Sequence, residues 1–340
     1  MSTDLGIAVL GAGFIADLHA RAARSCSARL VVVAARDAER AAAFGDSHGF
    51  ARSTTDWAEA VTDPGVDLVV IGTPNALHHP QAMAAIAAGK HVLVDKPMAM
   101  TVAQADEMIA AAGAAGTVLA VGHMWRYRDE VIRLRDRIAA GDLGRVVRTR
   151  GYGIHAGWRP SGWFVDPALS GGGALIDMGI HAIDTARFLL GDPDPVRVVA
   201  SIGNGFDPTH GLDDDGVVLI DWSNGTRSVV ECGWSQPVLD GVEAETDVYA
   251  TAGHARIWPG FTATTPPPDG YEHCAVDMYA AQMADVLACC SSGGTPVASA
   301  EVGRTALAIT QAAMASSAEL GRPAELGRSP AFDDSTEVVS

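Results

Sequence analysis

The feature that most constrains the fold is a regular alternation of short apolar segments and longer alanine-rich segments in the first third of the chain. The apolar segments are "GIAVLGAG", "LVVVAA", "VDLVVIGTP", "HVLVDKP" and "TVLAVGH", and each ends near Gly, Pro or a charged residue. Strands that alternate with helices need crossover connections, and these produce a parallel sheet covered by helices. We therefore expect residues 1–123 to form a doubly wound α/β domain.

The character of the sequence changes after His123, where Gly, Trp and Pro become common. The runs "VRVVASIG", "GVVLIDWSNG", "TRSVVECGW" and "ETDVYATAG" predict strands of a largely antiparallel sheet. Asn224 and Gly225 stand between two of these runs and favour a hairpin turn. The segments "MYAAQMADVLACC" and "EVGRTALAITQAAMASSAEL" predict helices. Residues 124–326 are therefore expected to form an α+β domain, followed by an exposed tail over 327–340.

Composition narrows the class of protein. The chain has 340 residues, 48% of them apolar, and a net charge of −17 without a cluster of Lys or Arg, which argues against nucleic-acid and anionic-membrane partners. Its five cysteines form no CxxC pair, which disfavours a disulfide framework or a zinc–thiolate site. No leader-like segment and no apolar run of about 18 residues occurs, so we expect a cytoplasmic location.

A glycine motif at the start of the chain indicates a phosphate-binding turn. In "GIAVLGAGFIADLHARAA", Gly11, Gly13 and Ala16 form a G-x-G-x-x-A pattern between a predicted strand and a predicted helix. Gly11 permits a tight turn, Gly13 lets the backbone approach a diphosphate, and Ala16 allows close packing of helix on strand. The N–H groups of the helix N-terminus add an anion site. This context predicts a dinucleotide cofactor.

The end of the second predicted strand bears on which dinucleotide binds. An NAD-binding domain usually ends this strand with an acid that holds the ribose 2′-hydroxyl, but here the strand ends in Ala35 and Arg36. A guanidinium suits a 2′-phosphate, so the sequence favours NADP over NAD. Two alternatives stay open: Asp37 turns inward and holds the ribose of NAD, or Arg36 is a solvated surface residue.

Two further loops follow predicted parallel strands, where this architecture places ligands. The first is "TPNALHHP", in which Thr73, Pro74 and Asn75 are placed to line the nicotinamide side. The second contains "VDKP", where Lys96 stands between Asp95 and Pro97 with its backbone restrained. Its ammonium could be directed at a bound hydroxyl or carbonyl group. A catalytic and an exposed lysine are about equally compatible with the residues alone.

The stretch "GGGALIDMGIHAIDTARFLLG" places Asp177, His181 and Asp184 at steps of four and three residues. On a helix of about 3.6 residues per turn these side chains project from one face. A metal site is disfavoured, because no second His or Cys motif with zinc-ligand spacing accompanies them. An acid/base site and a capped, solvated helix with a core histidine both remain open, and the residues alone favour the latter.

The chain resembles the Gfo/Idh/MocA family of NAD(P)-dependent oxidoreductases. The resemblance runs through "GAGFIADLHA", "TPNALHHPQAMAAIAAGKHVLVDKPMAMT", "GDLGRVV", "GGGALIDMGIHAIDTARFLLG" and "TPVASAEVGRTALAITQAAMASSAELG". It implies an N-terminal Rossmann domain and a C-terminal domain whose open sheet forms a homodimer or homotetramer interface. It also implies catalytic roles for Lys96, Asp177 and His181, with Asp184 in support. The family's usual Glu-Lys-Pro is Asp-Lys-Pro here, which keeps the charge.

These roles fit the oxidation of a secondary alcohol, in which a hydride leaves carbon while a proton leaves oxygen. His181 has the pKa range of a general acid/base, Lys96 would polarise the reacting oxygen, and Asp177 would bind a neighbouring hydroxyl or orient the imidazole. We expect an NAD(P)-dependent oxidoreductase acting on a sugar, inositol-like polyol or glycoside. The alternatives are a biosynthetic ketosugar reductase and a non-catalytic dinucleotide sensor.

The complete set of candidate residues divides by role. The catalytic candidates are Lys96, Asp177, His181 and Asp184, and no metal ligand is expected. The cofactor candidates are Gly11, Gly13, Phe14, Ile15, Ala35, Arg36, Thr73, Pro74, Asn75, His78, Asp95 and Lys96, although a packing role is the more frequent one for a histidine such as His78. Substrate contacts are expected from Lys96, Tyr127, His155, Trp163, Asp177 and His181, because aromatic faces and donors suit a sugar ring.

Overall fold

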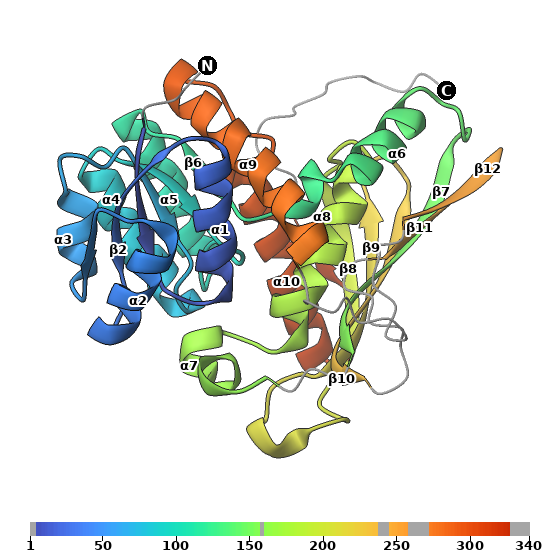
Figure 1. Cartoon of the computed structure of the whole chain (residues 1–340). Coiled ribbons are helices and arrows are strands. Elements are labelled where there is room, and N and C mark those ends of the chain that lie inside the picture. The colour runs from blue at the N-terminus through green and yellow to red at the C-terminus, as the bar shows by residue number, and fades with distance from the viewer. Residues whose placement is uncertain (1–4, 157–159, 237–244, 258–271, 327–340) are drawn as a thin grey trace.

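Two sheets, one parallel and one mixed, organise the chain (Figure 1). The structure is a computed structural model that describes residues 5–156, 160–236, 245–257 and 272–326. Helices α8 and α10 lie between the two sheets, and helix α9 runs along the first one (Figure 1). Their bounds are Ile180–Leu189 for α8, Glu272–Ser292 for α9 and Ala300–Ala318 for α10.

The first sheet is parallel throughout, as the alternating pattern predicts, with strand order β3-β2-β1-β4-β5-β6. This is the strand order of doubly wound dinucleotide-binding sheets. Its strands are β1 (Gly6–Leu10), β2 (Arg29–Ala34), β3 (Arg52–Thr54), β4 (Leu68–Ile71), β5 (His91–Val94) and β6 (Leu119–Val121). Its crossover helices are α1 (Phe14–Ser25), α2 (Ala38–His48), α3 (Trp57–Thr62), α4 (His78–Ala87) and α5 (Val102–Ala115).

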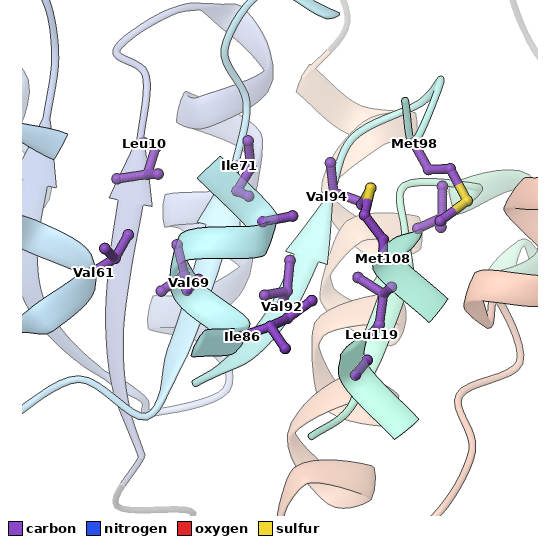
Figure 2. Close-up of a cluster of buried hydrophobic side chains, with 14 of the residues drawn as sticks. Leu10, Val61, Val69, Ile71, Ile86, Val92, Val94, Met98, Met108 and Leu119 are labelled. Carbon is purple, nitrogen blue, oxygen red and sulfur yellow. The ribbon is translucent and has the colours of Figure 1, made fainter. Parts of the chain in front are cut away.

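Continuous apolar strands place buried side chains on both faces of this sheet. On one face Val69, Ile71, Val92 and Val94 pack with Met108 of α5 (Figure 2). On the other face alternate residues of the same strands pack against α1 and α9. The two cores explain why the strand sequences are apolar at nearly every position.

The second sheet has strand order β12-β11-β7-β10-β9-β8-β13. Its strands are β7 (Val146–Ala156), β8 (Pro195–Gly203), β9 (Asp215–Trp222), β10 (Arg227–Gln236), β11 (Thr246–Ala250), β12 (Gly253–Ile257) and β13 (Ala324–Glu325). Among the described strands of this second sheet, only β7 and β10 pair in parallel, so the expected mostly antiparallel sheet is confirmed. Asn224 and Gly225 form the β9–β10 hairpin turn, where Gly225 has φ 79°.

Helices cover one face of the second sheet. Residues of α8 and α10 pack with inward-facing residues of β8, β9 and β10. On the opposite face Val217 and Leu219 of β9 are 43% and 50% exposed. Helix α6 (Asp129–Ala139) packs against α8, and the short α7 (Pro167–Ser170) lies near the first sheet's loops.

Helix α9 returns to the first sheet late in the chain. Its residues Tyr279, Met283, Val286 and Leu287 are buried in the same cluster as Ile7 of β1. A division near His123 therefore separates the two sheets in sequence, but the C-terminal segment completes the packing of both. The predicted tail over 327–340 lies outside the described residues. Among the described helices, none is long and apolar enough to cross a membrane.

Candidate active site

A cavity of about 540 Å³ opens at the carboxyl ends of the parallel strands. The first half of the chain contributes Gly13, Phe14, Ile15, Leu18, Gly72, Thr73, Asn75, Asp95 and Lys96 to its wall, together with Met124 and Trp125 of the turn after β6. The second half contributes Trp163, Phe164, Ser170, Gly172, Ile176, Asp177, Met178, His181 and Trp234, and α9 adds Met278 and Tyr279. The cavity thus lies between the two halves, which is a usual position for a ligand site.

The glycine turn is shaped for close approach of a ligand. Gly11 has φ 109°, and a Cβ there would lie 2.5 Å from the carbonyl oxygen of Gly72. A Cβ on Gly13 would meet nothing within 4 Å, so the cavity beside Gly13 is open. Gly13 also forms the N-cap of α1 and, because it has no side chain, provides no side-chain acceptor for the first N–H groups of the helix. Open space beside a helix N-terminus fits a diphosphate, so these residues fit a dinucleotide.

The loop after β4 forms the next part of the wall. The Asn75 amide donates to the carbonyl of Ser170 at 2.7 Å, which joins the first half to α7 of the second. His78 does not line the cavity: its ring nitrogens lie 2.8 Å from the carbonyl oxygens of both Pro97 and Thr73. Burial lowers the pKa of His78. These contacts hold the loops after β4 and β5 together, and a contact of His78 with a cofactor stays a prediction.

Lys96 and Asp177 meet across the cavity. The Lys96 ammonium donates to Asp177 Oδ1 at 2.7 Å and to the Asp177 carbonyl oxygen at 2.8 Å. The indole of Trp234 donates to Asp177 Oδ2 at 2.9 Å. His181 lines the same cavity and is 4% exposed. A cation from the loop after β5 and an anion and an imidazole from the continuous helical stretch over residues 175–189 therefore share one apolar pocket.

Asp184 does not join them, so the expectation of one common face is corrected. Residues Leu175–Gly179 form a π-helical turn, and α8 begins only at Ile180. A π-turn holds more residues than an α-turn, so spacing by 3.6 residues does not carry across it. Asp177 and His181 face the cavity, whereas Asp184 points toward Arg126 and is absent from the cavity wall.

Asp184 is buried and forms an ion pair with Arg126. It is 2% exposed and accepts three hydrogen bonds of 2.7 to 2.9 Å from Arg126. Burial alone would raise the pKa of Asp184, but the adjacent Arg126 holds this pKa below its ordinary value. Arg126 also donates to Asp192 at 2.6 and 3.1 Å. The network joins the turn after β6 to α8.

Asp95, directly before Lys96, is a buried carboxyl group of the cavity wall. Burial raises its pKa to about 6, although the neighbouring Lys96 charge opposes the shift. A Cβ on Gly122 would lie 2.4 Å from Asp95 Oδ1. The glycine after β6 thus leaves room for this carboxylate beside the cavity.

The remaining predicted residues divide between the cavity and the core. Trp163 lines the cavity and stacks on Phe164 with ring centroids 3.9 Å apart. Tyr127 is not part of the wall, since its hydroxyl donates to Asp285 at 2.7 Å and accepts from the Ala298 N–H, and its contact with a substrate stays a prediction. The side chain of His155 lies outside the described residues. Pro74, Ala35 and Arg36 are not part of the wall, and the last two follow the end of β2.

Sequence reasoning missed Trp234 and Arg40. Trp234 ends an inward-facing series with Val230 and Cys232 on β10, and this alternation is the signal that could have located it. Arg40 donates from Nε to the carbonyl of Ala12 in the glycine turn at 2.9 Å, a contact across 28 residues that no local pattern predicts. Within the described ranges, no group of three or more His, Cys, Asp or Glu side chains is arranged to hold a metal ion.

The sheet order, the glycine turn and the cavity define a dinucleotide-binding α/β protein with a second, ligand-contacting domain. Residues 5–123 match the sequence model of the GFO/IDH/MocA oxidoreductase family with an NAD-binding Rossmann fold, and residues 131–256 match the GFO/IDH/MocA C-terminal domain. The chain belongs to this family.

Individual relatives agree with this assignment. The chain is 42% identical to a 1,5-anhydro-D-fructose reductase of Ensifer adhaerens over 182 residues, 53% of this chain and 54% of that protein. It is 34% identical to a D-glucoside 3-dehydrogenase of Escherichia coli K12 over 197 residues, 56% of each. The matches thus span about half the length of these curated relatives. The crystal structure of GenD2 from gentamicin A biosynthesis, in complex with NAD, superposes with a TM-score of 0.87 at 28% identity, covering 95% of this chain and 97% of that one.

Proposed function

We propose that this protein is an NAD(P)-dependent oxidoreductase that moves a hydride between the nicotinamide and a secondary hydroxyl or ketone of a sugar, inositol-like polyol or glycoside. The observation that carries the proposal is the meeting of Lys96, Asp177 and His181 in one cavity beside the open glycine turn. The names of the two curated relatives, a reductase of an anhydro sugar and a dehydrogenase of glucosides, support a sugar derivative as substrate.

Each residue has a distinct task in this reaction. The bound nicotinamide supplies the hydride acceptor or donor. His181 takes the proton of the alcohol during oxidation and returns it during reduction, because an imidazole titrates near neutral pH. Lys96 places a positive charge beside the oxygen on which negative charge develops. Asp177 anchors that ammonium through two hydrogen bonds, one from its carboxylate and one from its carbonyl.

The proposal is tested by fluorescence titration with NADH and NADPH, followed by a spectrophotometric screen of sugars, inositols and glycosides in both directions. We expect the wild-type protein to turn over members of the panel and His181→Ala to lower kcat about 100- to 10,000-fold, because the general acid/base is lost. Cofactor affinity should stay unchanged. Near-normal turnover by folded His181→Ala would contradict the assignment. Cofactor binding by the wild type without any turnover would favour the sensor, and turnover only of ketosugars the biosynthetic reductase.

For the cofactor, we propose a preference for NADP. No acid ends β2, and Asp37 caps α2 by accepting the Arg40 N–H at 2.8 Å, which favours a structural role for this carboxylate. Arg40 in turn contacts the glycine turn. We expect Arg36 and Arg40 to be two basic side chains near the ribose of the bound cofactor. Two guanidinium groups suit a 2′-phosphate.

Arg36→Leu is expected to lower kcat/KM for NADPH about 10- to 100-fold, because a charge-assisted contact with the 2′-phosphate is lost. The value for NADH should change less than about twofold, since NADH lacks that phosphate. Arg24→Leu, at the far end of α1, is the matched control and should leave both values unchanged. A wild-type protein that uses NADH better than NADPH would contradict the preference.

For the assembly, we propose a homodimer or homotetramer joined through the open face of the second sheet. The described face lacks a covering helix at β9, and its exposed Val217 and Leu219 provide an apolar surface. Such surfaces on a folded chain are typical of association sites.

A further inference from the structure

Trp234 lies two residues before the end of β10, and its side chain lines the cavity. Its backbone N–H donates to the carbonyl of Asp214 at 2.8 Å. The indole packs with Ala174, Met178 and Leu212, and it is 1% exposed. A side chain held by packing and by the sheet has little freedom, so its N–H points in one direction.

That direction is toward Asp177. The indole N–H meets Asp177 Oδ2 at 2.9 Å, while the Lys96 ammonium meets Oδ1 at 2.7 Å. One donor comes from β10 and the other from the loop after β5, and between them they fix the plane of the carboxylate. Each hydrogen bond also favours the ionised form of the acid over the protonated form.

The hydrogen bond from Trp234 to Asp177 matters because another carboxylate lies near Asp177. Among the described residues, Lys96 and Asp95 after β5, His181 of α8 and Tyr279 of α9 are the ionisable groups that share its pocket. Asp95 and Asp177 lie close enough for their charges to repel. A neutral donor on Oδ2 offsets this repulsion without adding a charge that would compete with Lys96.

We propose that Trp234 is a positioning residue of the active site, whose indole N–H holds the Asp177 carboxylate in the orientation and anionic state that anchor the Lys96 ammonium. The inference rests on the proposed function only for its effect on turnover. The anchoring itself is a property of the three side chains, and it can be measured without a substrate.

The variant Trp234→Phe keeps a ring and removes the N–H. Trp222→Phe is a matched control, because the Trp222 indole is also buried in the second sheet and donates to Ser228 Oγ at 2.7 Å, away from the cavity. We expect Trp234→Phe to lower kcat about tenfold with KM nearly constant, the size of one charge-assisted hydrogen bond. The acidic limb of the pH–rate profile should move to higher pH, because the anion has lost a donor. Trp222→Phe should change neither quantity.

Two further measurements test the proposal. The first separates the effect of Trp234 on Asp177 from a general defect in folding, and the second needs no turnover. In an Asp177→Asn background, Trp234→Phe should lower kcat no further, because Trp234 acts through Asp177. Lys90 and Lys96 are the only two lysines of the chain, so acetic anhydride labelling followed by mass spectrometry reports Lys96 with Lys90 as internal reference. Loss of the anchor should raise the relative labelling of Lys96 several-fold in Trp234→Phe and not in Trp222→Phe.

Unchanged Lys96 labelling together with an unchanged pH profile in Trp234→Phe would overturn the proposal. Changed labelling in a protein whose wild type turns over no substrate would support the anchoring and refute the proposed function instead. If Trp234→Phe does not fold, incorporation of 3-benzothienylalanine at position 234 retains the shape of the indole and removes only its donor. Lys96 labelling and the pH–rate profile of that variant then test the proposal in the same way.

Discussion

Replacing Lys96 by methionine is expected to lower kcat about 100- to 1,000-fold, the usual effect of removing a donor that stabilises charge on a reacting oxygen. Methionine keeps most of the length of the side chain and removes its charge, so the cavity should stay filled. The affinity for NADH or NADPH, measured by fluorescence titration, should change little, because the glycine turn and the helix N-terminus carry the diphosphate. Steady-state kinetics on the best substrate of the panel measure the loss.

Lys90→Met is a control within the same structural unit. Lys90 stands before β5 and Lys96 two residues after its end, so both variants lose a lysine beside one strand. The Lys90 ammonium donates to the carbonyl oxygens of Asp63 and Val66 at 3.0 and 2.8 Å, and it lies outside the cavity wall. Lys90→Met should therefore lose some stability and retain kcat. Equal kinetics for the two variants would refute the role given to Lys96.

Arg126→Met is expected to lower the free energy of unfolding by about 3–5 kcal/mol, because it leaves the buried Asp184 carboxylate without its counterion. Asp184 has His123 Nδ1 at 3.7 Å, but burial lowers the pKa of His123, so this ring does not replace the guanidinium. Urea unfolding followed by circular dichroism measures the difference.

Two comparisons show whether the loss comes from an unpaired buried charge. In Arg126→Met/Asp184→Leu both ions are gone, and much of the stability should return, since an apolar pair can replace a buried ion pair. Arg133→Met removes an arginine of α6 that is 66% exposed and 3.9 Å from Asp129, so its cost should stay below about 1 kcal/mol. If Arg126→Met lowers the free energy of unfolding no more than Arg133→Met does, the network around Asp184 does not stabilise the fold.

The alternating pattern of the first third was sufficient to predict its parallel sheet, because each strand is bounded by local signals. The hairpin at Asn224 and Gly225 and the helices α9 and α10 follow from equally local features. Local periodicity specifies elements well, because it records which side of each element is buried.

The candidate site was predictable only in part. Lys96, Asp177 and His181 stand beside recognisable motifs, and they do share the cavity. The shared face of Asp177 and Asp184 was mispredicted because the π-turn over Leu175–Gly179 alters the angular register between Asp177 and α8. The orientations of the Tyr127 and Trp234 side chains depend on contacts with residues far away in the chain. Tyr127 contacts Asp285, and Trp234 contacts Asp177. Such contacts depend on how the two halves pack, which periodicity does not record.

Because α9 packs on the first sheet but lies late in the chain, it affects when the fold and the binding site are completed during synthesis. Strands β1 and β4 leave the ribosome early, but Tyr279, Met283 and Leu287, which cover one face of these strands, are made much later. Until then the nascent chain exposes a wide apolar surface, the kind of surface that chaperones bind and that promotes aggregation. Met278 and Tyr279 also belong to the cavity wall, so the binding site is completed only after these residues have emerged.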